Sequence, residues 1–89
     1  MMAVYTPKIK AQVQSIRIPV EFTVDIVEYD FVPPYIGLRF YESQWKYLSE
    51  HERLKATIYL TKIKEVIEAH GINVTIDPVY DMPGIQRLG

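Results

Sequence analysis

With 89 residues, the chain has room for one domain and no second hydrophobic core. Its 10 basic and 11 acidic side chains give a formal net charge of -1, so no overall positive field would draw the chain to nucleic acid or to an anionic membrane. It has no cysteine, which excludes disulfide bonds and thiolate metal sites.

Two further traits of the composition bear on location and source. The segment MMAVYTPKIK lacks the apolar core of a signal peptide, and no apolar run reaches about eighteen residues, the length that a membrane-spanning helix needs. We therefore expect a soluble, cytoplasmic protein with no membrane partner. A single asparagine alongside abundant Lys and Glu follows a trend of hyperthermophile proteins and favours a thermophilic source, archaeal or viral.

The hydrophobic content is high for so short a chain. Hydrophobic residues make up 48% of the sequence, yet a small domain buries a smaller share of its surface than a large domain does. Apolar side chains that one copy cannot bury favour association between copies. We expect a homo-oligomer, with a dimer as the favoured form.

A strand-like pattern covers residues 9–26 and contains one change of phase. Apolar side chains occupy odd positions in its first part and even positions in its second part. Because the side-chain period of a strand is two, an extra residue must be absorbed near Gln14–Ser15, by a β-bulge within one long strand. The alternative is a bend that separates two strands, roughly 4–13 and 16–29. Pro19 cannot donate to a ladder, which favours a sheet edge here.

A second strand is predicted after Pro33–Pro34. Neither proline can continue a helix or a central strand, so the pair marks a turn. Residues 35–41 then alternate, with Ile36, Leu38 and Phe40 on one face. Because the connection is short, we expect an antiparallel hairpin with the preceding strand.

The most regular signal is an amphipathic helix between Ser49 and Gly71. Ser49 and Glu52 form a capping box, in which each side chain accepts a hydrogen bond from the other residue's backbone N–H. Gly71 supplies the left-handed conformation that closes many helices. Between them, one apolar stripe follows the helical period. Its members are Ala56, Tyr59, Leu60, Ile63, Val66, Ile67 and His70.

These elements, a short helix at 42–48 and a strand at 72–77 predict an α+β fold. The sheet is largely antiparallel with three to four strands, in the order β-β-α-β, or β-β-β-α-β if the first ribbon is bent in two. One long helix packs on one face. A single domain spans residues 1–89, with extended or loosely ordered tails at 1–8 and 79–89.

No motif that carries chemistry is present, neither a nucleophile elbow, nor a glycine-rich phosphate loop, nor an HExxH sequence. His70 lies in the last helical turn, where the helix dipole favours a cation, and His51 lies at the opposite end, so the two cannot share a metal ion. We expect no catalytic residue, no cofactor and no metal. The paired acidic residues fall at strand ends and turns, where Asp is common: Glu28 with Asp30, and Asp77 with Asp81.

Apolar residues in two places are candidates for a protein interface. Beyond Ile26, apolar side chains appear on both faces of the ribbon. Leu54 and Ile58 project away from the main helical stripe, where a helix on an open sheet should be polar. They contact either a partner or the segment 42–48 folded back over them. The predicted interface residues are Val27, Tyr29, Phe31, Val32, Leu54 and Ile58.

A surface for single-stranded nucleic acid is the alternative. The charged residues before Glu21 are all basic, and one strand face carries tyrosines that could stack on bases. Against this, the later half of the ribbon is acidic and would repel phosphates, and no RNP-type or helix-turn-helix signature is present. The residues for this alternative are Lys8, Lys10, Arg17, Tyr35, Arg39 and Tyr41.

The sequence therefore favours a small, non-catalytic, self-associating module for protein interaction, with an unidentified protein as a further partner. Single-strand nucleic-acid binding is the second hypothesis. An enzyme ranks third, because no activated group is identifiable.

Overall fold

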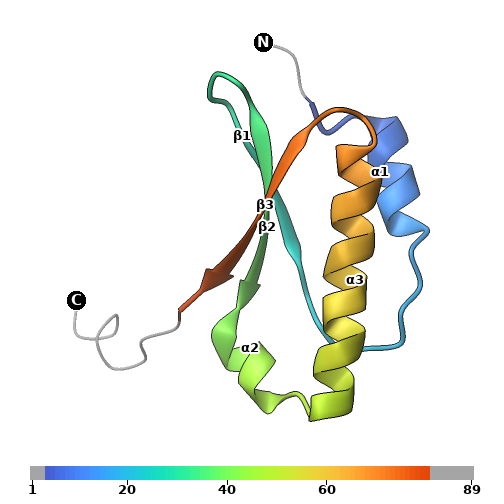
Figure 1. The fold of residues 1–89 in the computed structure, drawn as a ribbon, viewed down its shortest axis with the longest axis vertical. Helices are drawn as coiled ribbons and strands as arrows, with labels where there is room; N and C mark the ends of the chain where they lie inside the picture. The colour runs from blue at the N-terminus through green and yellow to red at the C-terminus, as the bar shows by residue number, and fades with distance from the viewer. Residues whose placement is uncertain (1–3, 81–89) are drawn as a thin grey trace.

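The computed structural model describes residues 4–80, and its longest element is the helix α3, Glu50–Glu68 (Figure 1). The capping box predicted for its start is present. The Ser49 hydroxyl accepts the N–H of Glu52 at 3.2 Å, and the Glu52 carboxylate accepts the N–H of Ser49 at 2.8 Å. Gly71, with a φ of 79°, lies just beyond the helix, as predicted. The other elements are α1 (Pro7–Gln14), β1 (Asp25–Tyr29), β2 (Tyr35–Tyr41), α2 (Glu42–Tyr47) and β3 (Asn73–Val79).

The strands form one sheet in the order β1-β2-β3, with β2 at its centre. β1 and β2 make the antiparallel hairpin predicted around Pro33–Pro34, and their register places Asp25 opposite Arg39. β3 pairs with the other edge of β2 in parallel, which places Asp77 beside Arg39. These three charged residues therefore form one row across the sheet.

The α+β architecture, with a long helix on one face of a three-stranded sheet, agrees with the predicted β-β-α-β arrangement. The sheet is mixed, however, because β3 runs parallel to β2. The reason is the connection between them. Helices α2 and α3 carry the chain from the end of β2 back along the sheet, so β3 starts beside the beginning of β2.

Residues 7–14 form the helix α1, so the strand predicted over 4–13 is wrong. The Thr6 hydroxyl caps the helix by accepting the N–H of Ile9 at 3.4 Å. Pro7 takes the first helical position, where its missing N–H costs nothing. Ile9 and Val13 are both buried. Two apolar residues four apart fit one helix face as well as one strand face. The Thr6 cap starts the helix, and the contact with α3 that buries both side chains favours it.

The segment 15–24 belongs to no strand, so the predicted bulge does not form and the strand of this region is confined to β1. Its anchor is Phe22, whose buried ring lies 5.2 Å from Phe40 and 5.9 Å from Trp45. The Gln44 side chain also accepts the N–H of Thr23 at 2.7 Å. Aromatic packing and a side-chain hydrogen bond replace the expected ladder.

The hydrophobic core lies between the sheet and the helices α1 and α3, which are on the same side of it (Figure 1). The predicted stripe of α3 supplies much of it: Ala56, Leu60, Ile63 and Ile67 are buried, and Tyr59 and Val66 are partly buried. His70 is exposed. Four side chains are the largest that are fully buried: Ile36 and Leu38 of β2, and Ile63 and Ile67 of α3.

The segment 42–48 is helical up to Tyr47, as predicted, but it does not cover the outer side of α3. Leu54 and Ile58 are 58% and 40% exposed. Trp45 packs against Phe22 and Phe40 instead, and its ring faces the Arg53 guanidinium at 5.9 Å. The predicted contact within the chain is therefore wrong for these two residues.

The predicted tails fall largely at the limits of the described chain. Of residues 1–8, the first three lie outside the described residues, and Pro7 already belongs to α1. Of residues 79–89, Val79 ends β3, and residues 81–89 lie outside the described residues.

Two isoleucines of α3 test which side of the helix is packed. Ile63→Ala should lower the free energy of unfolding by about 2–5 kcal/mol, because it leaves a cavity in the core. Ile58→Ala, the matched control on the outer side, should change it by less than about 1 kcal/mol. Urea unfolding followed by circular dichroism measures both. Equal losses for the two variants would contradict the packing described.

The capping box predicts a pH dependence of stability. Hydrogen bonds from the backbone N–H and the side chain of Ser49 lower the pKa of Glu52 below its ordinary value. The ionised carboxylate therefore favours folding above the pKa of the unfolded chain, and this contribution is lost as the pH falls through the folded pKa. Glu52→Gln keeps the geometry without the charge. The stability advantage of the wild type over this variant should shrink as the pH falls through that range, measured by urea unfolding at each pH.

Candidate functional site: the open face of the sheet

One face of the sheet carries no helix in the described part of the chain (Figure 1). Side chains of residues paired across a ladder project to the same side, so the register identifies the members of this open face. Ile36 and Leu38 alternate with them and point to the core. The open face comprises Asp25, Val27 and Tyr29 of β1; Tyr35, Gly37, Arg39 and Tyr41 of β2; and Asn73, Thr75, Asp77 and Val79 of β3.

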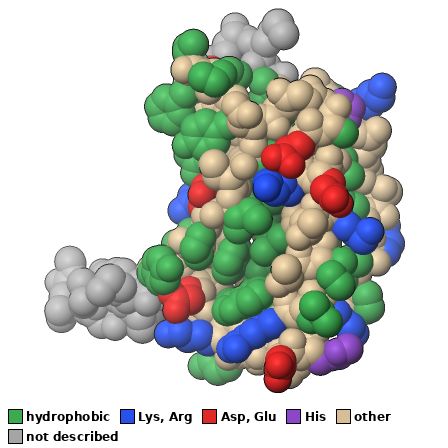
Figure 2. All heavy atoms as spheres, viewed as in Figure 1, with side chains coloured by type: hydrophobic (Ala, Val, Ile, Leu, Met, Phe, Trp, Pro, Cys, Tyr) green, Lys and Arg blue, Asp and Glu red, His purple; other side chains and the backbone are tan. Residues whose placement is uncertain are grey.

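Three rings form an aromatic cluster where β1 turns into β2. Tyr29 and Tyr35 face one another across the ladder with ring centroids 4.7 Å apart and an interplanar angle of 17°. Phe31 stacks 5.8 Å from Tyr35 and is 60% exposed. Val32, at the turn, is completely exposed. Figure 2 shows hydrophobic side chains gathered over this end of the hairpin, at the upper left. Such cofacial rings leave broad apolar surface available for contact.

Gly37 lies at the centre of the open face and makes the cluster possible. A β-carbon added there would lie 2.7 Å from Cε2 of Tyr29 and 2.6 Å from Oδ2 of Asp77. The absent side chain thus lets the Tyr29 ring and the Asp77 carboxylate close over the backbone of β2. This is a close approach that only glycine allows.

Charged residues cross the middle of the open face in one row. Arg39 lies between Asp25 on β1 and Asp77 on β3. Within residues 4–80, neither carboxylate approaches the Arg39 guanidinium closely enough to form an ion pair. Asp77 instead accepts a hydrogen bond from the Thr75 hydroxyl at 3.2 Å. The row therefore has one cation between two anions.

The structure divides the residues predicted for a protein interface into two groups. Val27 and Tyr29 lie on the open face, and Phe31 joins them through the aromatic cluster. Leu54 and Ile58 project from the outer side of α3, which has the sheet on its other side. One flat partner surface cannot contact both groups.

The residues predicted for nucleic acid are divided in the same way. Tyr35, Arg39 and Tyr41 share the open face, as the alternation of β2 predicts. Lys8 and Lys10 belong to α1, on the helical side of the sheet, and Arg17 follows that helix. The predicted basic residues and the predicted stacking rings therefore do not form one surface.

Two of the residues considered for metal or acid–base chemistry form contacts within the chain. His70, in the turn after α3, contacts Gln12 of α1, with 2.7 Å between its Nε2 and Oε1 of Gln12. Glu28 accepts the N–H of Val4 at 3.2 Å. No group of three or more His, Cys, Asp or Glu residues within residues 4–80 could hold a metal ion. Asp81 lies outside the described residues.

Six members of the open face were not among the predicted site residues: Gly37, Asp25, Asp77, Asn73, Thr75 and Val79. Gly37 was seen as a strand residue but not as the seat of a ring, and Asp25 and Asp77 were not connected with Arg39. The signal for Gly37 was its position inside a strand, where a glycine often marks the close approach of another group to the backbone. The charge row had no such signal, because it depends on the parallel register of β3.

Comparison with protein-family models, with curated proteins and with solved structures gives no significant match, so the site is interpreted from its own geometry. Between residues 4 and 80, no helix is long and apolar enough to cross a membrane.

Gly37→Ala tests the seat of the Tyr29 ring. The added β-carbon should displace that ring and lower the free energy of unfolding by about 1–3 kcal/mol, as overpacking does. In a Tyr29→Ala background, where the ring is gone, the same change should cost less than about 1 kcal/mol, since only the end of the Asp77 side chain must move. Urea unfolding of the four proteins completes the cycle. An equal cost in both backgrounds would show that the ring does not lie over Gly37.

Proposed function

We propose that the protein is a non-catalytic interaction module that forms a homodimer by packing the open faces of two sheets together about a two-fold axis. The observation that carries this proposal is the composition of the open face, which combines apolar and aromatic surface with a charge row that complements itself. The lack of cysteine supports a cytoplasmic setting.

Apolar surface supplies the driving force. Val27 and Val79 on the open face are partly buried, and Tyr41 is half exposed. The aromatic cluster extends this surface to the end of the hairpin. Sheets that pack face to face bury such side chains between layers about 10 Å apart. A second copy would thus cover what one helical layer leaves open.

The charge row supports a second copy as the occupant. In a two-fold interface the same patch meets itself, so each residue pairs with a different residue of the other copy. A cation flanked by two anions fits this geometry, because Arg39 of each copy can face Asp25 or Asp77 of the other copy. Three charges of one sign would repel their symmetry mates. When the charge rows of the two copies are offset by one strand, Arg39 of each copy lies opposite a carboxylate of the other copy, and no like charges face one another.

Single-strand nucleic-acid binding remains the alternative proposal, supported by the exposed ring faces of the aromatic cluster. It is weaker because the open face carries two carboxylates for one guanidinium. Lys8 and Lys10, which would have to neutralise phosphates, lie on the helical side.

A charge exchange tests the dimer. Arg39→Glu makes the row entirely negative, and Asp25→Lys with Asp77→Lys makes it entirely positive. Each variant alone should dimerise at least about thirtyfold more weakly than the wild type, since breaking an interfacial charge pair costs about 2–5 kcal/mol. An equimolar mixture should recover a heterodimer. Sedimentation equilibrium over a wide concentration range and native mass spectrometry measure the two results.

Lys62→Glu is the matched control, because it makes the same change of charge at an exposed position of α3 and should leave the dimer unchanged. A wild type that stays monomeric at every concentration, or a mixture that forms no heterodimer, would refute the proposal. Saturable binding of a fluorescent oligothymidylate at low salt, abolished by Arg39→Glu, would establish the alternative.

A further inference from the structure

A trough separates the segment 15–24 from β1 on the helical side of the molecule. Its two adjoining pockets have volumes of 420 Å³ and 840 Å³, and both are lined by Ile16, Arg17 and Tyr59. These volumes are within the range of small-molecule sites. The trough exists because the segment 15–24 runs alongside α3 and does not join the sheet as a strand.

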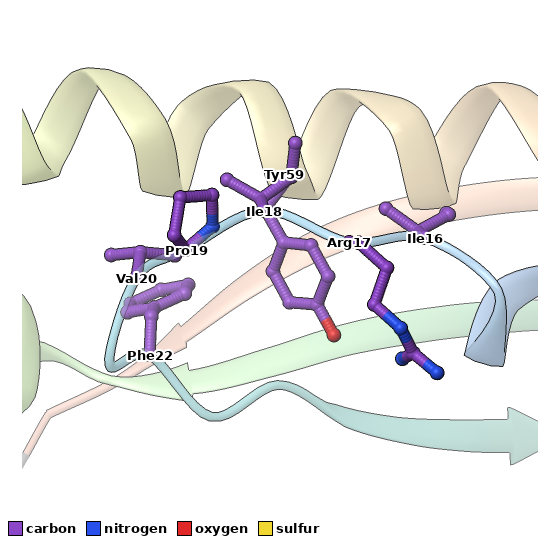
Figure 3. Close-up of a pocket in the computed structure, with 7 residues that line it drawn as sticks. All are labelled: Ile16, Arg17, Ile18, Pro19, Val20, Phe22 and Tyr59. Carbon is purple, nitrogen blue, oxygen red and sulfur yellow. The ribbon is translucent and has the colours of Figure 1, made fainter.

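Two polar groups stand together where the pockets meet. Figure 3 shows the Tyr59 side chain of α3 and the Arg17 side chain pointing in the same direction, side by side. Nη1 of Arg17 donates to the carbonyl of Gln14, the last residue of α1, at 2.9 Å. This bond holds the guanidinium in place, and its other N–H groups donate to no residue within 4–80.

More polar groups lie in the larger pocket. Burial, and to a smaller extent the neighbouring Tyr59, raise the pKa of the Tyr5 hydroxyl, so this phenol is a neutral donor at physiological pH. Neither tyrosine hydroxyl donates to a described residue. Lys10 adds a second cation, while Asp25 is the one carboxylate of the lining. Cations therefore outnumber anions around the trough.

Most of the side chains that line the smaller pocket are apolar. Ile18, Val20 and the buried ring of Phe22 line it beyond Arg17. A guanidinium beside a phenol, next to an apolar wall, is suited to a molecule with an apolar body and an anionic head. The planar fork of Arg matches a carboxylate through two parallel hydrogen bonds.

We propose that the trough binds a small organic acid, its carboxylate held by Arg17 and the Tyr59 hydroxyl and its apolar body lying along Ile18, Val20 and Phe22. The residues proposed to hold the acid lie outside the open face, which shares only Asp25 with the lining of the trough, and the site does not depend on the proposed dimer.

The test is a titration of the isotopically labelled full-length protein with 2-naphthoate, monitored by NMR. Saturable shifts should appear at the Ile18 and Val20 methyl groups, with a Kd of about 1 mM or tighter, and not at Leu54 on the outer side of α3. The neutral 2-naphthamide should bind about tenfold more weakly or not at all. Naphthyl phosphate distinguishes the head group, and binding tighter than that of naphthoate would overturn the assignment to a carboxylate.

Variants assign the residues. Arg17→Gln should weaken naphthoate binding at least about tenfold, and Tyr59→Phe should weaken it severalfold. The affinity of Arg17→Lys should lie between those of the wild type and Arg17→Gln, because lysine keeps the charge but lacks the planar fork of donors. Lys62→Gln removes a positive charge at an exposed position of α3 that lines neither pocket; it is the matched control and should leave binding unchanged. Arg17→Gln should leave the dimer intact, so the two proposals fail separately. No saturable shift in the wild type, or equal affinity in Arg17→Gln, would overturn the site.

Discussion

The packing of α3 on β2 is the contact on which the rest of the structure depends. Ile63 and Ile67 of the helix and Ile36 and Leu38 of the strand are its fully buried side chains. Removing these apolar surfaces from water is the main stabilising term available to a chain that has no cysteine and, within residues 4–80, only two ion pairs, both partly exposed. The same contact sets the topology, because α3 spans the sheet and returns the chain so that β3 pairs in parallel with β2.

This arrangement leaves one face of the sheet uncovered within residues 4–80. One layer of helices covers only one face, and the strands alternate, so every second residue of β2 points away from the core. The chain places rings, valines and a charge row on that side. A sheet face meant only for water would be polar. The proposed dimer is based on this apolar and aromatic character of the open face. The absence of a side chain at Gly37 lets the Tyr29 ring pack there against the backbone.

The sequence identified many of the site residues but did not predict which of them share one surface. Val27, Tyr29 and Phe31 were assigned to one hypothesis and Tyr35, Arg39 and Tyr41 to another, yet the register places the strand residues of both sets on one face. Lys10 and Arg17 were placed with the tyrosines of β2 but lie with α1 and the segment after it. The reason is that residues 7–14 form a helix and residues 15–24 join no strand, whereas the sequence pattern predicts a strand there.

The sequence by itself determined the elements whose signals are local. The capping box of α3, its apolar stripe, the glycine that ends it and the proline turn of the hairpin all depend on residues a few positions apart. Only the tertiary structure decided the rest. Ile9 and Val13 suit a strand or a helix equally, and burial against α3 favours the helix. The direction of β3, the row of Asp25, Arg39 and Asp77, and the trough beside Tyr59 arise from segments far apart in the chain, whose relative placement is set by which arrangement buries the most apolar surface.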